Sequence, residues 1–542
     1  MTASASTKTV LLALDQGTTS SRAILFDRRG VPLATAQEEF PQITRSQITR
    51  SQITRSQIIK TGSGGGQGTA DDDTEEVAIV EHDPEAIWRS QLACARSVLA
   101  SSGTAAEQVA AIGVTNQRET TILWDRATGQ PVAPAIVWQS RVSAAICARL
   151  RAQGIEDTVS RRTGLRIDPY FSATKIMHLL ETLPGLRSRC EAGEILFGTV
   201  DTFLIWRLTG GRVHATDVTN ASRTLLFDIH RLEWSDELCG LFGVPRAILP
   251  EVRPSSGFFG VTDADWLGAP IPITGCAGDQ QAAAFGQGCV RPGDAKTTYG
   301  TGAFLMFATG HEPVASRHGL LTTPACTVRG GEATAAPVAT DYFLEGSVFV
   351  AGSLVGWLRD GLGMIEHPRE IEPLARSVED SGGVMIVPAL TGLGAPHWDH
   401  CARGLMIGLS RATSQAHIAR AALESIALSV ADVVNCMQQD AGVRLSRLRV
   451  DGGASSNDLL MQMQADVLGL PVERPTVLES TSLGAALLAG LATGFFPDQT
   501  AVEEARRVER VFEPRLAEQS RTRLLARWQT AVARSRGWTR QE

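Results

Sequence analysis

Paired cysteines, long hydrophobic runs and basic clusters are scarce in this chain of 542 residues. Its nine cysteines form no Cys-x-x-Cys motif, so neither a disulfide framework nor a zinc ribbon is indicated, and we interpret them as small core residues in a reducing compartment. The longest nearly unbroken apolar stretch, 484–496, is shorter than the ~20 residues that cross a bilayer. The apolar run 10–14 is too short for a signal peptide. We therefore expect a cytoplasmic protein without a membrane span.

An excess of basic residues and two familiar nucleotide-binding motifs are missing as well. Lys and Arg number 51 against 58 Asp and Glu, a net charge of −7 without a long basic run, so no nucleic-acid partner is expected. None of the lysines follows a glycine, which excludes a Walker loop. No Gly-x-Gly-x-x-Gly opens a helix after a strand, so a Rossmann dinucleotide site is not supported either.

What is present is the composition of a globular protein with layered α/β structure. Hydrophobic residues make up 43% and charged residues 20%, and the length predicts two large domains or about three to four smaller ones. The runs 109–114, 383–390 and 448–450 resemble buried strands, and they alternate with the helical patterns 84–100 and 419–437. Strands that alternate with helices predict an α/β fold.

Two similar units suggest that the chain contains a duplicated domain. The runs 10–14, 23–26 and 31–36 are separated by turn residues and predict three antiparallel strands at the start of the chain. A second Gly-Thr turn, 297–302, leads into another apolar run, 303–308. The two halves of the chain therefore each begin with a hairpin of the same kind.

Between these units lies a segment of low complexity, 42–76. The unit Gln-Ile-Thr-Arg-Ser repeats in tandem and is followed by a glycine-rich and then an acidic stretch. A period of five matches neither the 3.6 residues of a helical turn nor the two of a strand. We predict a flexible surface insertion.

The turn that follows the first strand has the chemistry of a phosphate-binding loop. Thr18, Thr19 and Ser20 offer hydroxyl and amide donors, and Arg22 offers a bidentate cation. Asp15 would repel a bare phosphate, so its place here makes sense if a divalent cation such as Mg²⁺ stands between them. The alternative is a hairpin in which Asp and Thr merely satisfy turn amides.

Two further turns carry candidate groups at the start of predicted helices. Asp279, in the sequence Gly-Asp-Gln-Gln, is suited to accept a proton from a substrate hydroxyl beside a phosphoryl donor, although an acidic residue in this place is often only a helix N-cap. The glycine-rich turn 450–457 is a second candidate for phosphate binding, with ordinary helix entry as its alternative.

Arg118 and Glu119, which end a predicted strand, place donors and an acceptor side by side. Polyol hydroxyls need both, so the pair suggests a polyol site, whereas the alternative is a surface ion pair worth at most ~1 kcal/mol. The segment 397–401 contains His, Asp and Cys without spaced partners, so we do not interpret it as a metal site.

Taken together, these segments resemble the FGGY carbohydrate-kinase family over nearly the whole chain. The segments that carry the resemblance are ALDQGTTSSR at 13–22, GVTNQRETT at 113–121, GTVDT at 198–202, TNASRT at 219–224, GDQQ at 278–281, TYGTG at 298–302 and TGLGAP at 391–396. The resemblance implies two ribonuclease-H-like α/β domains, as in actin, sugar kinases and heat-shock ATPases, with a central cleft. We place a substrate-binding N-terminal domain at 1–286 and a nucleotide-binding C-terminal domain at 287–542.

The resemblance also implies roles for individual residues. Glycerol would be bound by Arg118, Glu119, Trp138, Tyr170, Asp279, Gln280 and Phe304. Asp279 would be the catalytic base, and Asp15 and Asp279 would hold Mg²⁺. The residues near ATP would be Thr18, Thr19, Ser20, Arg22, Gly300, Thr301, Gly352, Gly453 and Asn457.

The implied reaction is transfer of the γ-phosphoryl group of ATP to glycerol, giving sn-glycerol 3-phosphate in glycerol catabolism. Two alternatives stay open: a kinase of another polyol or sugar, and a catalytically silent actin-like protein that binds nucleotide. We expect glycerol and ATP as partners, and a homodimer or homotetramer.

The sequence departs from the family pattern at two positions. Gly356 stands where relatives often carry a glutamine near the adenine, and His178 replaces a common tryptophan, which we interpret as a packing change. His230 lies where some members are phosphorylated, but we interpret it as an ordinary surface histidine.

Overall fold

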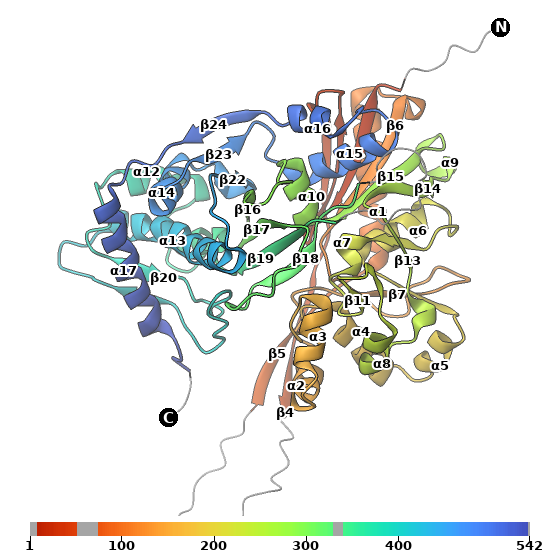
Figure 1. The fold of residues 1–542 in the computed structure, drawn as a ribbon, viewed down its shortest axis with the longest axis horizontal. Helices are drawn as coiled ribbons and strands as arrows, with labels where there is room; N and C mark the ends of the chain where they lie inside the picture. The colour runs from red at the N-terminus through yellow and green to blue at the C-terminus, as the bar shows by residue number, and fades with distance from the viewer. Residues whose placement is uncertain (1–7, 51–73, 329–339, 540–542) are drawn as a thin grey trace, which may run out of the picture.

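The computed structural model describes residues 8–50, 74–328 and 340–539, and it places them in two lobes, each built around a mixed β-sheet (Figure 1). The first lobe contains a six-stranded sheet in the order β14-β15-β6-β1-β2-β3. Its strands are β1 (Val10–Gln16), β2 (Ser20–Phe26), β3 (Pro32–Glu39), β6 (Val109–Asn116), β14 (Ser256–Val261) and β15 (Pro272–Gly278). β1, β2 and β3 are antiparallel, as the sequence predicts, whereas β6 runs parallel to both β1 and β15.

The second lobe contains a seven-stranded sheet in the order β18-β19-β17-β16-β22-β23-β24. Its strands are β16 (Ala295–Tyr299), β17 (Ala303–Gly310), β18 (Leu321–Pro324), β19 (Tyr342–Val348), β22 (Leu448–Asp451), β23 (Val472–Pro475) and β24 (Val508–Phe512). Three antiparallel strands, β16, β17 and β19, are followed in space by the parallel strands β22 and β23. The first sheet has the same order and directions in β1, β2, β3, β6 and β15, so the two lobes repeat one topology.

Helices cover both faces of the first sheet because β1 alternates its side chains between them. Val10, Leu12 and Leu14 belong to the core that includes α1 (Pro84–Ser102). Leu11 and Ala13 belong to a different core, which α10 (Asp279–Gly286) and α15 (Ser480–Ala492) complete. Successive residues of a strand point to opposite faces, so Asp15 follows Leu11 and Ala13 onto the face of α15.

α10 and α15 cross at very short range between the two sheets. A Cβ atom on Gly484 would lie 1.9 Å from the carbonyl oxygen of Ala282, and one on Gly286 would lie 2.3 Å from that of Ser480. Only glycine permits backbones to approach this closely. The crossing fixes α15, which comes late in the sequence, against the first sheet (Figure 1).

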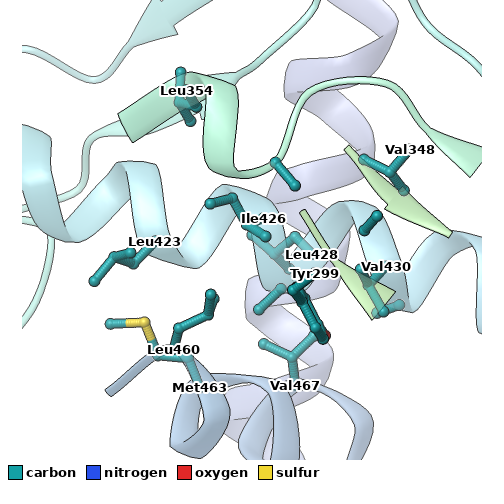
Figure 2. Packing of buried hydrophobic residues seen from close by; sticks show 14 of the residues in the cluster. Tyr299, Val348, Leu354, Leu423, Ile426, Leu428, Val430, Leu460, Met463 and Val467 are labelled. Carbon is teal, nitrogen blue, oxygen red and sulfur yellow. The ribbon is translucent and has the colours of Figure 1, made fainter. Parts of the chain in front are cut away.

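The core of the second lobe lies between its sheet and the helices α13 (Gln415–Ala441) and α14 (Asp458–Leu468). Figure 2 shows Tyr299 among the side chains of these two helices, where its ring is fully buried. The Tyr299 hydroxyl donates a hydrogen bond of 2.6 Å to the side chain of Gln464. Tyr299 is the last residue of β16, so this packing fixes the turn that follows it.

The remaining helices and small sheets surround these two units. The other α-helices are α2 (Ala144–Ala152), α3 (Glu156–Thr163), α4 (Ser172–Thr182), α5 (Leu186–Glu191), α6 (Val200–Leu208), α7 (Val218–Ala221), α8 (Asp236–Phe242), α9 (Ala264–Leu267), α11 (Gly352–Asp360), α12 (Ile371–Arg376), α16 (Gln499–Ala505) and α17 (Glu518–Ser535). The strands of the small sheets are β4 (Ile43–Arg50), β5 (Thr74–His82), β7 (Ile122–Asp125), β8 (Ala135–Ile136), β9 (Ile195–Gly198), β10 (Ala215–Asp217), β11 (Phe227–Asp228), β12 (Glu233–Trp234), β13 (Glu251–Arg253), β20 (Met385–Val387) and β21 (Leu405–Ile407).

The prediction of a flexible insertion at 42–76 is wrong at both of its ends. β4 and β5 pair antiparallel along their length, from Ile43 opposite Glu81 to Arg50 opposite Thr74, and extend away from the two large sheets (Figure 1). A hairpin is held by backbone hydrogen bonds, which need no amphipathic stripe, so the five-residue period did not prevent strand formation. The remainder of the insertion, 51–73, lies outside the described residues.

Two predicted absences can be compared with the structure. In the described part of the chain, no helix combines the length and apolar character needed to span a bilayer. All nine cysteines are free and six of them are buried, which agrees with their interpretation as core residues.

Candidate active site

Asp15, Arg118 and Asp279 meet at one edge of the first sheet, where three neighbouring parallel strands end. Asp15 lies opposite Thr115 of β6, and Thr115 lies opposite Ala277 of β15. Since adjacent strands are about 4.8 Å apart, the backbones at Asp15 and near Asp279 are separated by about 10 Å. The carboxyl ends of parallel strands are the usual ligand-binding edge of an α/β sheet.

Asp15 and Asp279 lie close enough for their charges to interact. Burial raises the pKa of Asp15, and the negative charge of Asp279 adds to this rise. Arg22 opposes it, as does a hydrogen bond of 2.6 Å that the Ser482 hydroxyl donates to Oδ2 of Asp15. Ser482 is fully buried in α15, on the face of the sheet to which Asp15 points.

The carboxylates of Asp15 and Asp279 fit the requirements of a hard divalent cation. Oδ1 of Asp279 accepts a hydrogen bond of 2.7 Å from the backbone of Gln280 and lies 3.1 Å from Nε of Arg118. Among the described residues, no hydrogen bond reaches Oδ2 of Asp279 or Oδ1 of Asp15. Two anionic oxygens therefore remain as ligands of the type that Mg²⁺ prefers.

A second acidic cluster, Asp201, Asp217 and Cys276, is buried beneath this edge and serves a structural purpose. Its ligand-type atoms lie within 4.8 Å of one another. The carboxylates already accept hydrogen bonds, from Thr199 and Thr216 to Asp201 and from Thr219, Asn220 and Ser255 to Asp217. Asp217 thereby caps α7, whose Thr219 hydroxyl accepts a hydrogen bond of 2.8 Å from the amide of Gly278. The cluster thus supports the residue that precedes Asp279.

The predicted phosphate turn closes β1 onto β2 beside these groups. The Gly17 amide donates to the carbonyl of Ser20, which forms a tight turn with Thr18 and Thr19 at its tip. Thr18 is anchored by the indole of Trp138, which donates a hydrogen bond of 3.0 Å to its hydroxyl. Arg22 lies opposite Asp15 in the hairpin, and its guanidinium is held by the side chain of Gln37.

Arg118 and Glu119 are almost completely buried, so the alternative of a surface ion pair is wrong. Their direct approach is only 3.9 Å. Arg118 instead forms a bidentate pair with Glu345, with two hydrogen bonds of 2.7 Å, whereas Glu119 accepts a hydrogen bond of 2.6 Å from Arg223. Burial raises the pKa of Glu119, while the positive charges of Arg223 and Arg118 lower it.

The backbone of Glu119 is held in a conformation that L-residues rarely adopt. Its φ is 61°, in the left-handed region. Its carbonyl oxygen accepts hydrogen bonds from Thr121, Ser172 and Lys175. Strained backbone of this kind costs about 1–3 kcal/mol and persists where the surroundings fix it, often at a functional site.

Three of the predicted substrate residues, Trp138, Tyr170 and Phe304, form an aromatic cluster. Trp138 packs edge-to-face on Tyr170, with ring centroids 5.6 Å apart, and on Phe304, with centroids 6.2 Å apart. Phe304 comes from β17 in the second lobe, whereas the other two come from the first. Residues of both lobes therefore line the site.

Gln280 is the remaining predicted substrate residue, and it is buried under a cation from the second lobe. Lys296 of β16 donates hydrogen bonds of 2.5 Å to the Gln280 side chain and 2.7 Å to the Thr298 hydroxyl. Burial lowers the pKa of Lys296, and the neighbouring carboxylates Asp451 and Asp279 oppose this.

The predicted nucleotide residues of the second lobe gather at the ends of β16 and β22. The amide of Gly352, at the start of α11, donates to the carbonyl of Gly300, and that of Ala351 donates to Thr301. The glycine-rich turn after β22 packs against the same place, because a Cβ on Gly452 would lie 2.5 Å from the carbonyl oxygen of Tyr299. The structure therefore brings the turns that contain Gly300, Thr301, Gly352 and Gly453 together.

Asn457 has a structural function in this turn. It caps α14, since its side chain accepts a hydrogen bond of 2.9 Å from the amide of Leu460. The alternative of ordinary helix entry is therefore correct for its carbonyl oxygen, and only its amide nitrogen remains for a ligand.

Several functional neighbours escaped the sequence analysis. They are Glu345, Arg223, Lys175, Lys296 and Ser482. Lys175 and Lys296 carried one usable signal, because a lysine inside an otherwise apolar or small-residue run is rarely buried without a partner. Glu345 and Ser482 carried none, since their local sequences form no motif.

The positions that depart from the family pattern are also placed. A Cβ on Gly356 would meet nothing within 4 Å, so this part of α11 borders open space where a longer side chain would fit. His178 is partly buried in α4. His230 is exposed and its ring is hydrogen-bonded to the carbonyl of Arg161. His397, in the segment not interpreted as a metal site, lies 3.6 Å from Asp432.

The chain is similar to known proteins over almost its entire length. Models of the FGGY family of carbohydrate kinases match residues 66–286 with the N-terminal domain and residues 295–493 with the C-terminal domain. Glycerol kinase from Bordetella parapertussis is 52% identical over 530 residues, 98% of each chain, and that of Dechloromonas aromatica is 52% identical over 97% of this chain and 98% of its own. The crystal structure of Plasmodium falciparum glycerol kinase with ADP is 33% identical, covers 98% of both chains and superposes with a TM-score of 0.84. The predicted two-domain α/β kinase fold is confirmed.

Proposed function

The chain belongs to the FGGY family of carbohydrate kinases, and from this premise we propose that it transfers the γ-phosphoryl group of ATP to glycerol, giving sn-glycerol 3-phosphate. One observation carries the choice of substrate: the Arg118–Glu119 pair is buried and Arg118 contacts Asp279, while Trp138, Tyr170 and Phe304 form an aromatic cluster. These residues combine polar groups with apolar rings, as a small polyol requires. Its relatives with about half of their residues identical carry the name glycerol kinase.

Glycerol fits this set of residues because each buried hydroxyl needs a donor and an acceptor. The guanidinium of Arg118 offers donors, and the carboxylate of Glu119 and the amide of Gln280 offer acceptors. Trp138, with Tyr170 and Phe304, would cover the carbon chain. The same rings would keep water from the reacting hydroxyl, which would limit hydrolysis of ATP.

Asp279 is the proposed catalytic base. Its Oδ1 is held by Arg118 and by the Gln280 amide, and among the described residues its Oδ2 accepts no hydrogen bond. Asp279 would orient the terminal hydroxyl of glycerol and accept its proton as the oxygen attacks the γ-phosphorus in line, with ADP as the leaving group. Positioning and charge neutralisation supply most of the acceleration.

ATP would lie between the turns of the two lobes. The phosphates would face the turns of both lobes, with the amides and hydroxyls of the first-lobe turn and the Arg22 guanidinium as donors. The nucleoside would lie toward the starts of the helices in the second lobe. The residues assigned to these roles are Thr18, Thr19, Ser20, Arg22, Gly300, Thr301, Gly352, Gly453 and Asn457. Asp15 and Asp279 would hold Mg²⁺, which neutralises phosphate charge when bound.

The decisive test is release of ADP by the purified chain with ATP and Mg²⁺, measured with and without glycerol. We expect a rate that depends on glycerol, that is abolished by a chelator and restored by Mg²⁺, with sn-glycerol 3-phosphate as product. A higher rate on xylulose or erythritol would identify a kinase of another polyol or sugar. No release with any of these substrates would identify a silent nucleotide-binding protein.

The organisation of the protein completes the proposal. We place a substrate domain at 1–286 and a nucleotide domain at 287–542, with residues of the other lobe completing each site. We further propose a homodimer or homotetramer in the cytoplasm. Light scattering of the purified protein measures the first, and cell fractionation the second.

A further inference from the structure

Glu345 is a buried carboxylate that reaches the proposed glycerol site from the other lobe. It lies in β19 of the second sheet, and its side chain is fully buried. Both of its oxygens accept hydrogen bonds of 2.7 Å from the two terminal nitrogens of Arg118, which follows β6 of the first sheet. The bidentate geometry fixes the plane of the guanidinium as well as its position.

The same carboxylate also reaches Glu119 through a second arginine. Oε1 of Glu345 accepts a hydrogen bond of 3.2 Å from Arg223, whose Nε donates one of 2.6 Å to Glu119. Arg118 and Glu119 themselves approach only to 3.9 Å, so the pair does not orient itself. Glu345 therefore contacts Arg118 directly and Glu119 through Arg223.

We propose that Glu345 is a positioning residue for glycerol: from the second lobe it fixes the donors of Arg118 and, through Arg223, the acceptor of Glu119. This inference rests on the proposed function and names a residue that does not itself touch the substrate. It explains why two opposite charges that adjoin in sequence do not simply pair with each other.

The hydrogen bonds of Arg118 show what this positioning achieves. A guanidinium has five N–H groups. Glu345 takes two of them, Gln281 a third at 3.2 Å, and Nε lies 3.1 Å from Asp279. Among the described residues this leaves one N–H on Nη2 without a hydrogen bond, besides the Nε–H that faces Asp279 in an ion pair. The carboxylate thus holds Arg118 with the Nη2 donor available in a defined direction.

Loss of the Glu345 charge would redirect the network. The four charges of Arg118, Arg223, Glu119 and Glu345 balance, and removal of one carboxylate leaves an excess positive charge in a buried place. Burial alone would raise the pKa of Glu345, but Arg118 and Arg223 lower it to about 2, so the group is ionised at neutral pH. Without it, Arg118 would turn toward Asp279 and Glu119, the groups that glycerol needs.

The test is the steady-state kinetics of Glu345→Gln, which keeps the shape of the side chain and removes its charge. The KM for glycerol is expected to rise by about 10-fold or more, the loss of a charged hydrogen-bonding arrangement, while the KM for ATP stays within about twofold. A purely structural defect would reduce the amount of active enzyme and so lower kcat without changing the KM for glycerol. Discrimination is a second readout, since kcat/KM for glycerol relative to propane-1,2-diol should fall.

Two further variants protect the test. Glu345→Asp keeps the charge but is too short to span both terminal nitrogens of Arg118, so the KM for glycerol should rise less than in Glu345→Gln. This variant carries the test if Glu345→Gln does not fold. Glu473→Gln is the matched control. Glu473 lies in β23, four strands away from β19 in the same sheet, and it is a buried carboxylate paired with Arg447 and Arg506. Its KM for glycerol should be unchanged.

The outcomes separate the inference from the proposed function. A wild-type protein that is active on glycerol, with an unchanged KM in folded Glu345→Gln or Glu345→Asp, would overturn the positioning role alone. A wild-type protein without activity on glycerol would overturn the proposed function. An equal rise in the KM for glycerol in Glu473→Gln would also contradict the proposal, because it would attribute the effect to general disturbance of the sheet.

Discussion

The hydroxyl of Ser482 donates a hydrogen bond of 2.6 Å to the carboxylate of Asp15, across 467 positions of sequence. It fastens the late helix α15 to the end of the first strand. Because the bond favours the charged form of Asp15, it opposes the effect of burial on the pKa of this carboxyl group.

Ser482→Ala is expected to move the acid limb of activity to higher pH. In its proposed role as a Mg²⁺ ligand Asp15 must be ionised, and burial already raises its pKa. Loss of the Ser482 hydrogen bond raises the pKa of Asp15 further, so activity should be lost at a higher pH than in the wild type. The measurement is the pH profile of kcat/KM for ATP, which reports groups of the free enzyme.

Ser480→Ala is the control for this shift. Ser480 is a buried serine in the same helix, and its hydroxyl accepts a hydrogen bond from Gln287 instead of facing Asp15. Its acid limb should coincide with that of the wild type. Coincident limbs in wild type and Ser482→Ala would show that the hydroxyl does not tune Asp15.

Lys175→Met should alter both glycerol binding and the pH dependence of stability. Lys175 donates to the backbone carbonyls of Glu119 and Tyr170, so its loss frees the strained backbone of Glu119 and raises the KM for glycerol. Burial lowers the pKa of Lys175 to about 7. Between this value and the ordinary pKa of about 10.4, the unfolded chain binds the extra proton, so the group makes wild-type stability increase with pH, by at most about 1.4 kcal/mol per unit.

Thermal unfolding at pH 7 and pH 9 measures this contribution. The gain between the two pH values should be smaller in Lys175→Met than in the wild type. Lys8→Met removes an exposed lysine and should behave as the wild type does. The same gain in Lys175→Met as in the wild type would mean that Lys175 stays charged in the folded protein.

Trp138→Phe tests the hydrogen bond between Trp138, in the aromatic cluster, and Thr18, in the predicted phosphate turn. Phenylalanine keeps a ring against Tyr170 and Phe304 but cannot donate to Thr18. We expect kcat to fall together with a rise in the KM for glycerol, by about fivefold each, the loss of one hydrogen bond. Trp206→Phe, a similar change at a ring contact with Trp124, should leave both constants unaltered. A change in the KM for glycerol alone would limit Trp138 to covering the substrate.

The groups that the sequence analysis identified lie in short local motifs. Asp15 lies near the end of β1 and Asp279 directly follows β15, so their place at one edge of the sheet follows from the parallel pairing of both strands with β6. Arg118 and Glu119 were recognised because they adjoin. Their environment could not be inferred, since the partner that allows Arg118 to be buried, Glu345, is 227 positions away.

The errors have the same physical origin. A charged pair is most often exposed, and only remote countercharges make burial tolerable. The repeat within 42–76 offered no hydrophobic stripe, yet β4 and β5 form a hairpin through backbone bonds that side-chain periodicity does not report. Asn457 illustrates the converse, because a residue predicted to bind nucleotide also caps the helix that follows it.

The most direct test of the account is Asp279→Asn, measured as glycerol-dependent ADP release beside glycerol-induced thermal stabilisation. Asparagine keeps the size of the side chain but is a far weaker base, so turnover should fall by about 10²–10⁴-fold. Glycerol should still raise the unfolding temperature, because Arg118 and Glu119 remain. Turnover close to that of the wild type in this variant would contradict the role of Asp279 and with it the proposed chemistry of the site.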